Sequence, residues 1–195
     1  MARPREFDPE EAMDKAMRLF WDVGYEDASL SELLATMEIT KGSFYKAFQD
    51  KHSIYLAALD RYDETVISET VRYLSDRNLG SGRTRILGLF GKVAELARRD
   101  GDRMGCLLCN ALVDKAAEGG ETEAKLQAMV LRLENGLFRA LMERAGADEV
   151  LSRETARGLL SIYLGLRVLG RAGLSAAMAG DCIRQVERLL ADPRA

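Results

Sequence analysis

Residues 39–51 read ITKGSFYKAFQDK, and this stretch decides the fold. If a helix begins at Lys41, Phe44 and Phe48 lie four residues apart on one side of it. The residues off that side carry hydroxyl or ammonium groups: Ser43, Tyr45 and Lys46. Two aromatic side chains would therefore anchor a short helix inward, while its polar side remains available to a partner.

Two capping signals place this helix in a larger motif. Ser29 and Glu32 have the spacing of a capping box, in which each side chain satisfies an exposed backbone donor of the other. Thr40 can cap the next helix. Two short helices joined by a few residues are typical of a helix-turn-helix, whose second helix projects from the domain surface. A preceding helix is expected to begin after Asp8 and to stop at Gly24.

The sequence of the rest of the chain predicts further helices, because apolar residues recur three and four positions apart and almost never alternate with polar ones. Asp50 can cap a long fourth helix that runs out near Asn78, where a Gly-rich break follows. Five more helices are expected, at about 83–98, 105–117, 122–144, 153–171 and 175–191. The expected fold class is therefore all-α.

Composition argues against several classes of protein. The 195 residues carry 28 Lys and Arg against 31 Asp and Glu, so no whole-chain basic excess points to nucleic acid or membrane. No charged leader or long apolar run is visible, so we expect a cytoplasmic protein without a membrane partner. Three cysteines suggest reduced thiols. The single histidine, His52, argues against metal sites and catalytic triads, so we expect no enzyme, metal or cofactor.

The polar side of the 41–48 helix suits phosphate, because hydroxyl and ammonium groups lie beside the backbone donors of a helix start. Gly42 lowers helix propensity but allows another backbone to come close. Against this, residues 1–62 hold eight Lys and Arg and twelve Asp and Glu. Local charge is more favourable, with three lysines and one acid between Thr40 and Lys51 and two arginines, Arg3 and Arg5, in an N-terminal arm. A short surface helix without DNA remains the alternative.

Residues 7–59, FDPEEAMDKAMRLFWDVGYEDASLSELLATMEITKGSFYKAFQDKHSIYLAAL, resemble the whole DNA-binding domain of the TetR (TetR/AcrR) family of one-component transcriptional regulators. The resemblance implies an all-helical homodimer in which residues 1–50 bind a palindromic operator in double-stranded DNA. Residues 51–195 would then form the ligand-binding and dimerisation domain, with helix four as the connector. Such a regulator, in most cases a repressor, is released by a small-molecule inducer.

The resemblance also implies which residues contact DNA. The expected set is Thr40, Lys41, Gly42, Ser43, Tyr45, Lys46 and Lys51. Lys46 and Ala47 stand where the family often has an aromatic residue and a histidine, so the base sequence that is read does not carry over.

The C-terminal half suggests a dimer seam and a ligand site. In ETARGLLSIYLGLRVLGRAGL, Gly158, Gly165 and Ala172 recur every seven residues, which would let another helix pack closely. A buried intrachain hairpin is the other interpretation, and the family resemblance favours the dimer. Candidate ligand-binding residues are Phe90, Cys106, Asn110, Met129, Leu133, Phe138 and Tyr163, with Arg167 as a further source of polarity.

The stretch GCLLCNALVD, residues 105–114, raises an alternative function. Cys106 is expected in the first turn of its helix, where the helix dipole and nearby Arg103 would favour the thiolate. Cys109 follows one turn later and could act as a resolving thiol. The alternative is therefore a helical ligand-binding or thiol-based redox and electrophile sensor with weak or lost DNA binding. Buried packing is the simpler interpretation of both cysteines.

Overall fold

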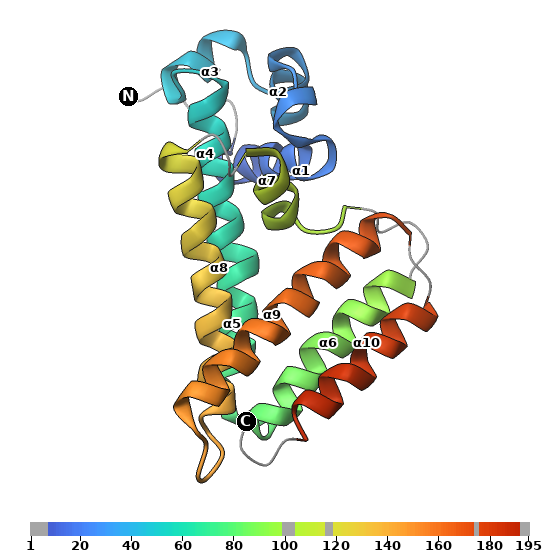
Figure 1. Cartoon of the computed structure of the whole chain (residues 1–195). Helices are drawn as coiled ribbons and strands as arrows, with labels where there is room; N and C mark the ends of the chain where they lie inside the picture. Colours follow the sequence, from blue (N-terminus) through green and yellow to red (C-terminus); the bar gives the residue numbers. More distant parts are fainter. Residues whose placement is uncertain (1–7, 99–103, 116–118, 174–175, 192–195) are drawn as a thin grey trace.

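The computed structural model describes residues 8–98, 104–115, 119–173 and 176–191 (Figure 1). Within these ranges the regular elements are helical and no strand is present. The helices are α1 (Pro9–Asp27), α2 (Leu30–Met37), α3 (Lys41–Ala47), α4 (Lys51–Tyr62), α5 (Ser68–Ser75), α6 (Gly82–Arg98), α7 (Leu107–Lys115), α8 (Gly120–Leu141), α9 (Glu149–Arg171) and α10 (Ala176–Leu189). The predicted all-α class is confirmed.

Helices α1 to α3 and the start of α4 form a small unit at one end of the molecule (Figure 1). The capping box is present, since Ser29 N donates to Glu32 at 3.0 Å and Glu32 N donates to Ser29 Oγ at 3.2 Å. Phe20, Leu33 and Phe44 are completely buried and form the centre of this unit. Local capping therefore sets where α2 begins, and aromatic burial holds the helices together.

The first helix differs from its expected end. Gly24 has φ 84° and ψ 175°, which breaks the helical path, but helical residues resume and α1 continues to Asp27. A side chain at this φ would be strained, so glycine is required for the kink. The predicted stop at Gly24 is thus a break within α1 rather than its end.

The predicted long fourth helix consists of three continuous segments. Helix α4 passes into a π-helical turn over Asp63–Ile67 and then into α5, which ends at Ser75, three residues before the expected Asn78. A 3₁₀ turn over Arg77–Leu79 follows. The α4–α5 rod runs alongside α8 and leads from the small N-terminal unit into the larger C-terminal bundle (Figure 1).

The C-terminal bundle is formed by α5, α6, α8, α9 and α10, and α7 lies against α1. The observed helices agree with the expected ones to within a few residues. Helix α9 begins four residues early because the Asp148 carboxylate accepts from Leu151 N at 2.8 Å. The expected end of α7 at residue 117 falls outside the described residues. In the part of the chain that the structure describes, no helix is long and apolar enough to cross a membrane.

Candidate nucleic-acid interface and ligand cavity

Helix α3 exposes the polar side that the sequence predicts. Phe44 is completely buried, and its ring lies 5.6 Å from the half-buried ring of Phe48. Thr40 caps the helix, since its Oγ1 accepts from Ser43 N at 3.1 Å. Tyr45 is 51% exposed, an unusual position for an aromatic side chain. The helix therefore has a packed side and an outward side with hydroxyl groups.

Three more of the predicted DNA-contacting residues lie on this outward surface. Lys41, Gly42 and Lys46 are all exposed. A Cβ placed on Gly42 would meet only Thr40 Oγ1, at 3.9 Å, among the described residues. Packing within this part of the chain therefore gives no reason for glycine at this position.

Lys51 has a different environment. Its ammonium donates to the carbonyl of Glu26 at 3.1 Å and lies 4.6 Å from the centroid of the Tyr25 ring. The ammonium of Lys115, from α7, lies 4.4 Å from the same ring and forms an ion pair with the Glu26 carboxylate, which lowers the pKa of Glu26. Lys51 is the first residue of α4 and is half-buried at the junction between α1, α4 and α7, so it is not part of the exposed side of α3.

A second set of contacts ties α1 to the C-terminal bundle at the Gly24 break. The last carbonyls before a helix break lack the usual intrahelical donors. Arg171, at the end of α9, donates to the carbonyl of Trp21 at 3.2 Å and to that of Asp22 at 2.8 Å. Asn110 of α7 also donates to the Trp21 carbonyl, at 3.2 Å. A cation at a helix end is electrostatically favourable, so these side chains act as a clamp on α1.

Directly beside this clamp lies a cavity of about 490 Å³ between α1, the π-helical turn, α5, α6 and α9. Its lining has polar and charged members, Arg18, Thr70, Lys92, Tyr163 and Arg167, and apolar ones, Trp21, Val66, Leu89, Leu96 and Met104. Burial raises the pKa of Tyr163 to about 12, so this side chain is neutral. The size suits a small organic molecule.

The seven residues that the sequence suggests for ligand binding do not surround one cavity. Tyr163 lines the cavity beside the clamp, and Phe90 packs against its ring with centroids 6.2 Å apart. Asn110 belongs to the clamp. Met129 and Leu133 are buried in the core along α8. The other two lie elsewhere, Phe138 under the guanidinium of Arg153 and Cys106 beside Tyr62.

Trp21, Arg18 and Lys92 are not among the ligand-binding residues that the sequence suggests, although all three line this cavity. One signal could have pointed to α1. Trp21 is the only tryptophan of the chain and stands beside the apolar face of α1 that the core residues define. Large amphipathic aromatic residues at such edge positions often line binding sites.

The two cysteines near α7 form a buried pair. Helix α7 begins at Leu107, so Cys106 is the residue before its first turn and not within it, and Asn110 N donates to the Cys106 carbonyl at 3.0 Å. The Sγ of Cys106 lies 3.2 Å from the Tyr62 hydroxyl. A hydrogen bond from Cys109, and a further one from Tyr62, lower the pKa of Cys106 to about 6 against the effect of burial. Arg103, which was expected to help, lies outside the described residues.

The thiol of Cys109 has the opposite character. Its hydrogen bond to Cys106 and its burial raise the pKa of Cys109. Its Sγ lies 3.7 Å from the carbonyl of Leu164 on α9. The structure therefore places a thiol that ionises easily, Cys106, beside one that stays protonated, Cys109.

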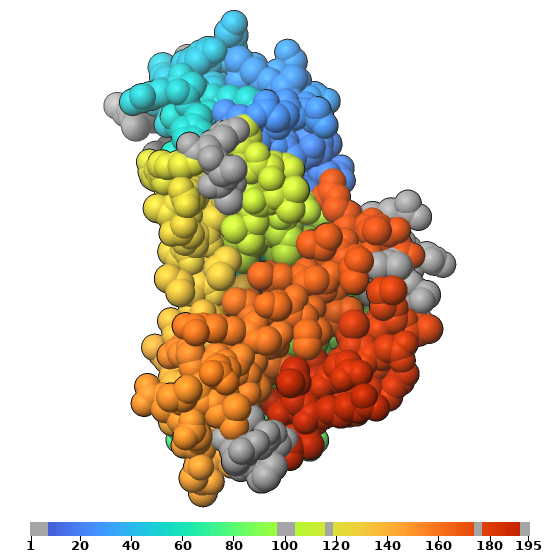
Figure 2. Space-filling model, in the orientation of Figure 1, coloured from blue at the N-terminus to red at the C-terminus, as the bar shows by residue number. Residues whose placement is uncertain are grey.

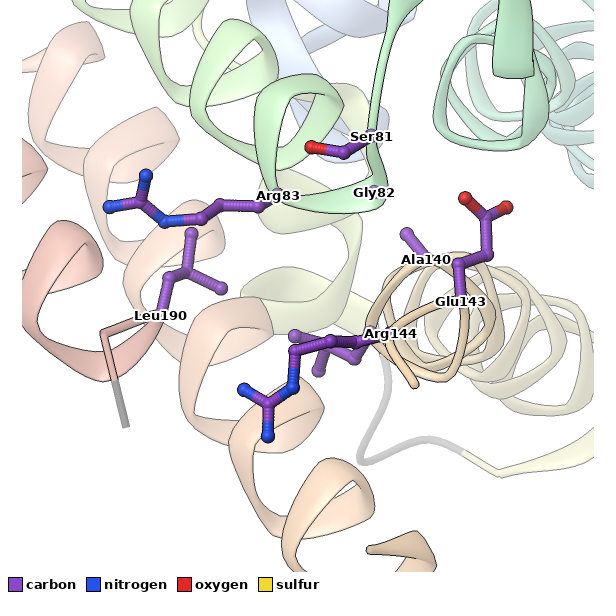
Figure 3. Close-up of a pocket in the computed structure, with 8 residues that line it drawn as sticks. Ser81, Gly82, Arg83, Ala140, Glu143, Arg144 and Leu190 are labelled. Carbon is purple, nitrogen blue, oxygen red and sulfur yellow. The ribbon is translucent and has the colours of Figure 1, made fainter. Parts of the chain in front are cut away.

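Another cavity, of about 310 Å³, lies at the far end of the bundle from α3, between the start of α6 and the ends of α8 and α10 (Figure 3). Glu143 lies on its wall and binds the completely buried Arg85 at 2.6 Å. The Arg85 side chain also donates to the Leu74 carbonyl at 2.8 Å. These groups hold α5, α6 and α8 together. The carboxylate on the cavity wall therefore has a structural role.

Helices α9 and α10 lie side by side on one face of the molecule (Figure 2). A Cβ on Gly158 or Gly165 would meet nothing within 4 Å among the described residues, so this part of α9 is open. Large apolar side chains are exposed on the two helices: Val168, Leu169, Met178 and Leu189. Such a face is characteristic of a surface that a partner covers.

A helix-turn-helix with an exposed polar helix, joined by a helical rod to a bundle with a cavity, defines a one-component DNA-binding regulator. The sequence model described as "Bacterial regulatory proteins, tetR family" matches residues 12–58. The HTH-type transcriptional repressor ComR of Escherichia coli (strain K12) is 26% identical over 179 residues, 89% of this chain and 84% of ComR. The HTH-type transcriptional repressor NemR of the same organism is 26% identical over 183 residues, 87% of each chain.

A solved structure extends the match to the whole fold. It is a cysteine mutant of the TetR family transcriptional regulator CifR complexed with 26-base-pair double-strand operator DNA. It has a TM-score of 0.80 and 26% identity, and the match covers 98% of this chain and 100% of the other. Together these similarities support a TetR family, ligand-responsive DNA-binding regulator. The resemblance inferred from the sequence is confirmed.

Proposed function

We propose that this chain is a transcriptional repressor that binds a palindromic operator as a homodimer and leaves it when a small molecule occupies the cavity beside the clamp. The observation that carries the proposal is the outward side of α3, where Tyr45 is 51% exposed on a helix anchored by the buried Phe44. Residues 1–50 would form the DNA-binding domain and residues 51–195 the ligand-binding and dimerisation domain. We assign it no catalytic step and place it in the cytoplasm, where its DNA is.

The DNA contacts divide into two kinds. Tyr45 and Lys46 stand on the exposed side of α3 and would face base edges and phosphates in the major groove. Lys41 and Thr40 lie at the start of the helix, and the open position of Gly42 lets the DNA backbone approach closely. Lys51 would add a phosphate contact if its ammonium turned from the Tyr25 ring and the Glu26 carbonyl towards the DNA.

The dimer would form through α9 and α10. The seam at Gly158 and Gly165 allows close helix packing, and the exposed apolar side chains of both helices would be covered by the same face of the partner. Two α3 helices would then meet successive major grooves about 34–36 Å apart. The spacing between them depends on how firmly α1 is held to the bundle.

The clamp provides a route from ligand to DNA. The side chain of Trp21 lines the cavity, while its carbonyl accepts hydrogen bonds from Arg171 and Asn110. Met104 repeats the pattern, since it lines the cavity and its carbonyl accepts from Arg171 at 3.2 Å. A ligand that displaces Trp21 or Met104 would disturb the clamp and change the position of α1. DNA and ligand must then weaken each other's binding by the same factor.

A mobility-shift assay on the DNA upstream of the chain's own gene tests the proposal. Tyr45→Ala should weaken operator binding by about tenfold or more, because one base-specific contact contributes about 1–3 kcal/mol. Lys51→Ala should weaken binding to all sequences and reduce the salt slope by about one. Arg139→Ala, an exposed change on α8 far from α3, is the control. The absence of a shift with micromolar wild-type protein would overturn the proposal.

A second candidate function, thiol-based sensing, is favoured by the contact of 3.2 Å between Cys106 and the Tyr62 hydroxyl. In this scheme the Cys106 thiolate attacks a peroxide, the O–O bond breaks, and sulfenic acid and hydroxide form. Cys109 then attacks the sulfenic sulfur, giving a disulfide and water. The hydrogen bond and charge that keep Cys109 protonated disappear once Cys106 is oxidised, which makes the second step easier.

The sensing scheme is tested by operator release after mild peroxide treatment. Release should require Cys106, so Cys106→Ser should stay on the operator, and Cys182→Ser, a change at the third cysteine, should respond like the wild type. Equal release from the Cys106 variant and the wild type would contradict the sensing function and leave both cysteines with a packing role in the core.

A further inference from the structure

The cavity beside the clamp has a charge pattern that points to the chemistry of its ligand. Among the described residues that line it, three are cationic, Arg18, Lys92 and Arg167, and none is acidic. The rest of the wall is mostly apolar and includes the indole of Trp21 and the side chain of Leu89. A low-dielectric wall strengthens the field of such charges.

Asp14 on α1 and the Tyr73 ring on α5 lie near two of these cations, Arg18 and Lys92. Asp14, one turn before Arg18, accepts a hydrogen bond from Arg61 Nε at 2.6 Å, and this bond, together with the charges of Arg61 and Arg18, lowers the pKa of Asp14. The ammonium of Lys92 lies 3.7 Å from the centroid of the Tyr73 ring. Arg18 and Lys92 are exposed, so both can turn towards a molecule that enters.

Two deeper groups add to the pattern. Arg167 donates to the backbone carbonyl of Gly105, a neutral acceptor, and its field favours the thiolate of Cys106. The indole Nε1 of Trp21 is buried and has no hydrogen-bond acceptor among the described residues. An unsatisfied buried donor is costly, and an acceptor atom of a ligand would relieve that cost.

We propose that this cavity takes an amphipathic organic anion, such as a monocarboxylate with an apolar body of medium length. The acidic head is held by Arg18, Lys92 and Arg167, and the body lies against Trp21 and Leu89. The inference rests on the proposed ligand response of the same cavity and specifies the chemical class that causes it. A neutral or cationic molecule of the same shape lacks the charge complementarity.

Three eight-carbon probes separate charge from shape: octanoate, 1-octanol and octylammonium. Trp21 is the only tryptophan of the chain and lines the cavity, so its fluorescence reports binding directly. Octanoate should bind about tenfold more tightly than octanol, since two partly exposed ion pairs contribute up to about one order of magnitude. Octylammonium should bind most weakly. Added salt should weaken the binding of octanoate and leave that of octanol unchanged.

Substitutions of the cationic residues test where the acidic head of the ligand binds. Lys92→Gln combined with Arg18→Gln should bring the affinities for octanoate and octanol to within about twofold of each other. The matched control is Arg83→Gln, which removes an exposed arginine at the far end of the bundle (Figure 3) and should preserve the preference for octanoate. Alkylation of Cys106 gives an independent readout, because an anion near Arg167 raises the pKa of the thiol and should slow the reaction.

Several results would overturn the inference. They are octanol or octylammonium binding at least as tightly as octanoate, no fluorescence response to any probe, or an octanoate preference that survives in the double variant. The fluorescence and alkylation measurements use the protein without DNA. Failure to bind an operator would therefore contradict the proposed function and not the inference. Octanoate binding without operator release would contradict the proposed ligand response, but it would still support an organic anion as the ligand of this cavity.

Discussion

Replacing Arg171 by methionine should separate the bundle from α1 without emptying the core. The change keeps an unbranched apolar stem and removes three charge-assisted hydrogen bonds, of 3.2, 3.2 and 2.8 Å. Asn110 still donates to the carbonyls of Trp21 and Met104, so the main loss is at Asp22. Because Arg171 is only half-buried, water replaces part of the interaction. We expect a loss of about 1–2 kcal/mol in the free energy of unfolding.

Thermal unfolding and operator titration measure the two consequences. A loss of this size lowers Tm by about 2–8 °C in a chain of this length. Operator release by ligand should also weaken, because the clamp no longer transmits the displacement of Trp21. Arg139→Met, an exposed change on α8, is the matched control and should change neither quantity. An unchanged Tm together with an unchanged ligand response in Arg171→Met would refute the clamp as the connection between the two domains.

Two glycines of α6 should respond in opposite directions. A Cβ on Gly82 would lie 1.8 Å from the Ala140 carbonyl oxygen, so Gly82→Ala should lower the free energy of unfolding by about 2 kcal/mol or more. A Cβ on Gly91 would meet nothing within 4 Å among the described residues, so Gly91→Ala should raise it by about 0.5–1 kcal/mol. Chemical denaturation measures both changes. Gly165→Glu should convert the dimer to monomers in sedimentation, since it places a charge in the open seam of α9; a dimer that persists would exclude this seam. Alkylation of Cys106 should rise with pH through about 6 and then level off, because the thiolate is the reactive form and its pKa is lowered; a rise that continues to pH values near 9 would indicate an ordinary thiol.

The N-terminal unit could be predicted from the sequence because its signals are local. Ser29 and Glu32 lie within one turn of each other, and Thr40 caps the helix that follows it directly. The spacing of Phe44 and Phe48 sets which side of α3 packs inward. Each signal acts over fewer than about five residues, so no knowledge of the tertiary structure is needed.

The cavity could not be predicted in the same way, because it depends on contacts between distant parts of the chain. Trp21 and Tyr163 are far apart in sequence and line the same cavity only in the folded chain, where α7 packs against both α1 and α9. Helical periodicity identifies apolar residues such as Met129 as inward-facing, but it does not distinguish a core position from a cavity wall. Arg85 shows the same limit, since its complete burial depends on an ion pair with Glu143 on another helix.

The symmetry of the dimer sets how strongly each ligand must act. Moving a regulator from about 99% DNA-competent to about 1% requires a difference of about 5.5 kcal/mol between the two states. Two identical cavities share this requirement, so each ligand must prefer the released state by about 2.7 kcal/mol, or about 100-fold. Ion pairs with the exposed Arg18 and Lys92 contribute too little alone. The remainder must come from groups whose surroundings change between the states, and Trp21 is such a group, because its indole lines the cavity while its carbonyl is part of the clamp.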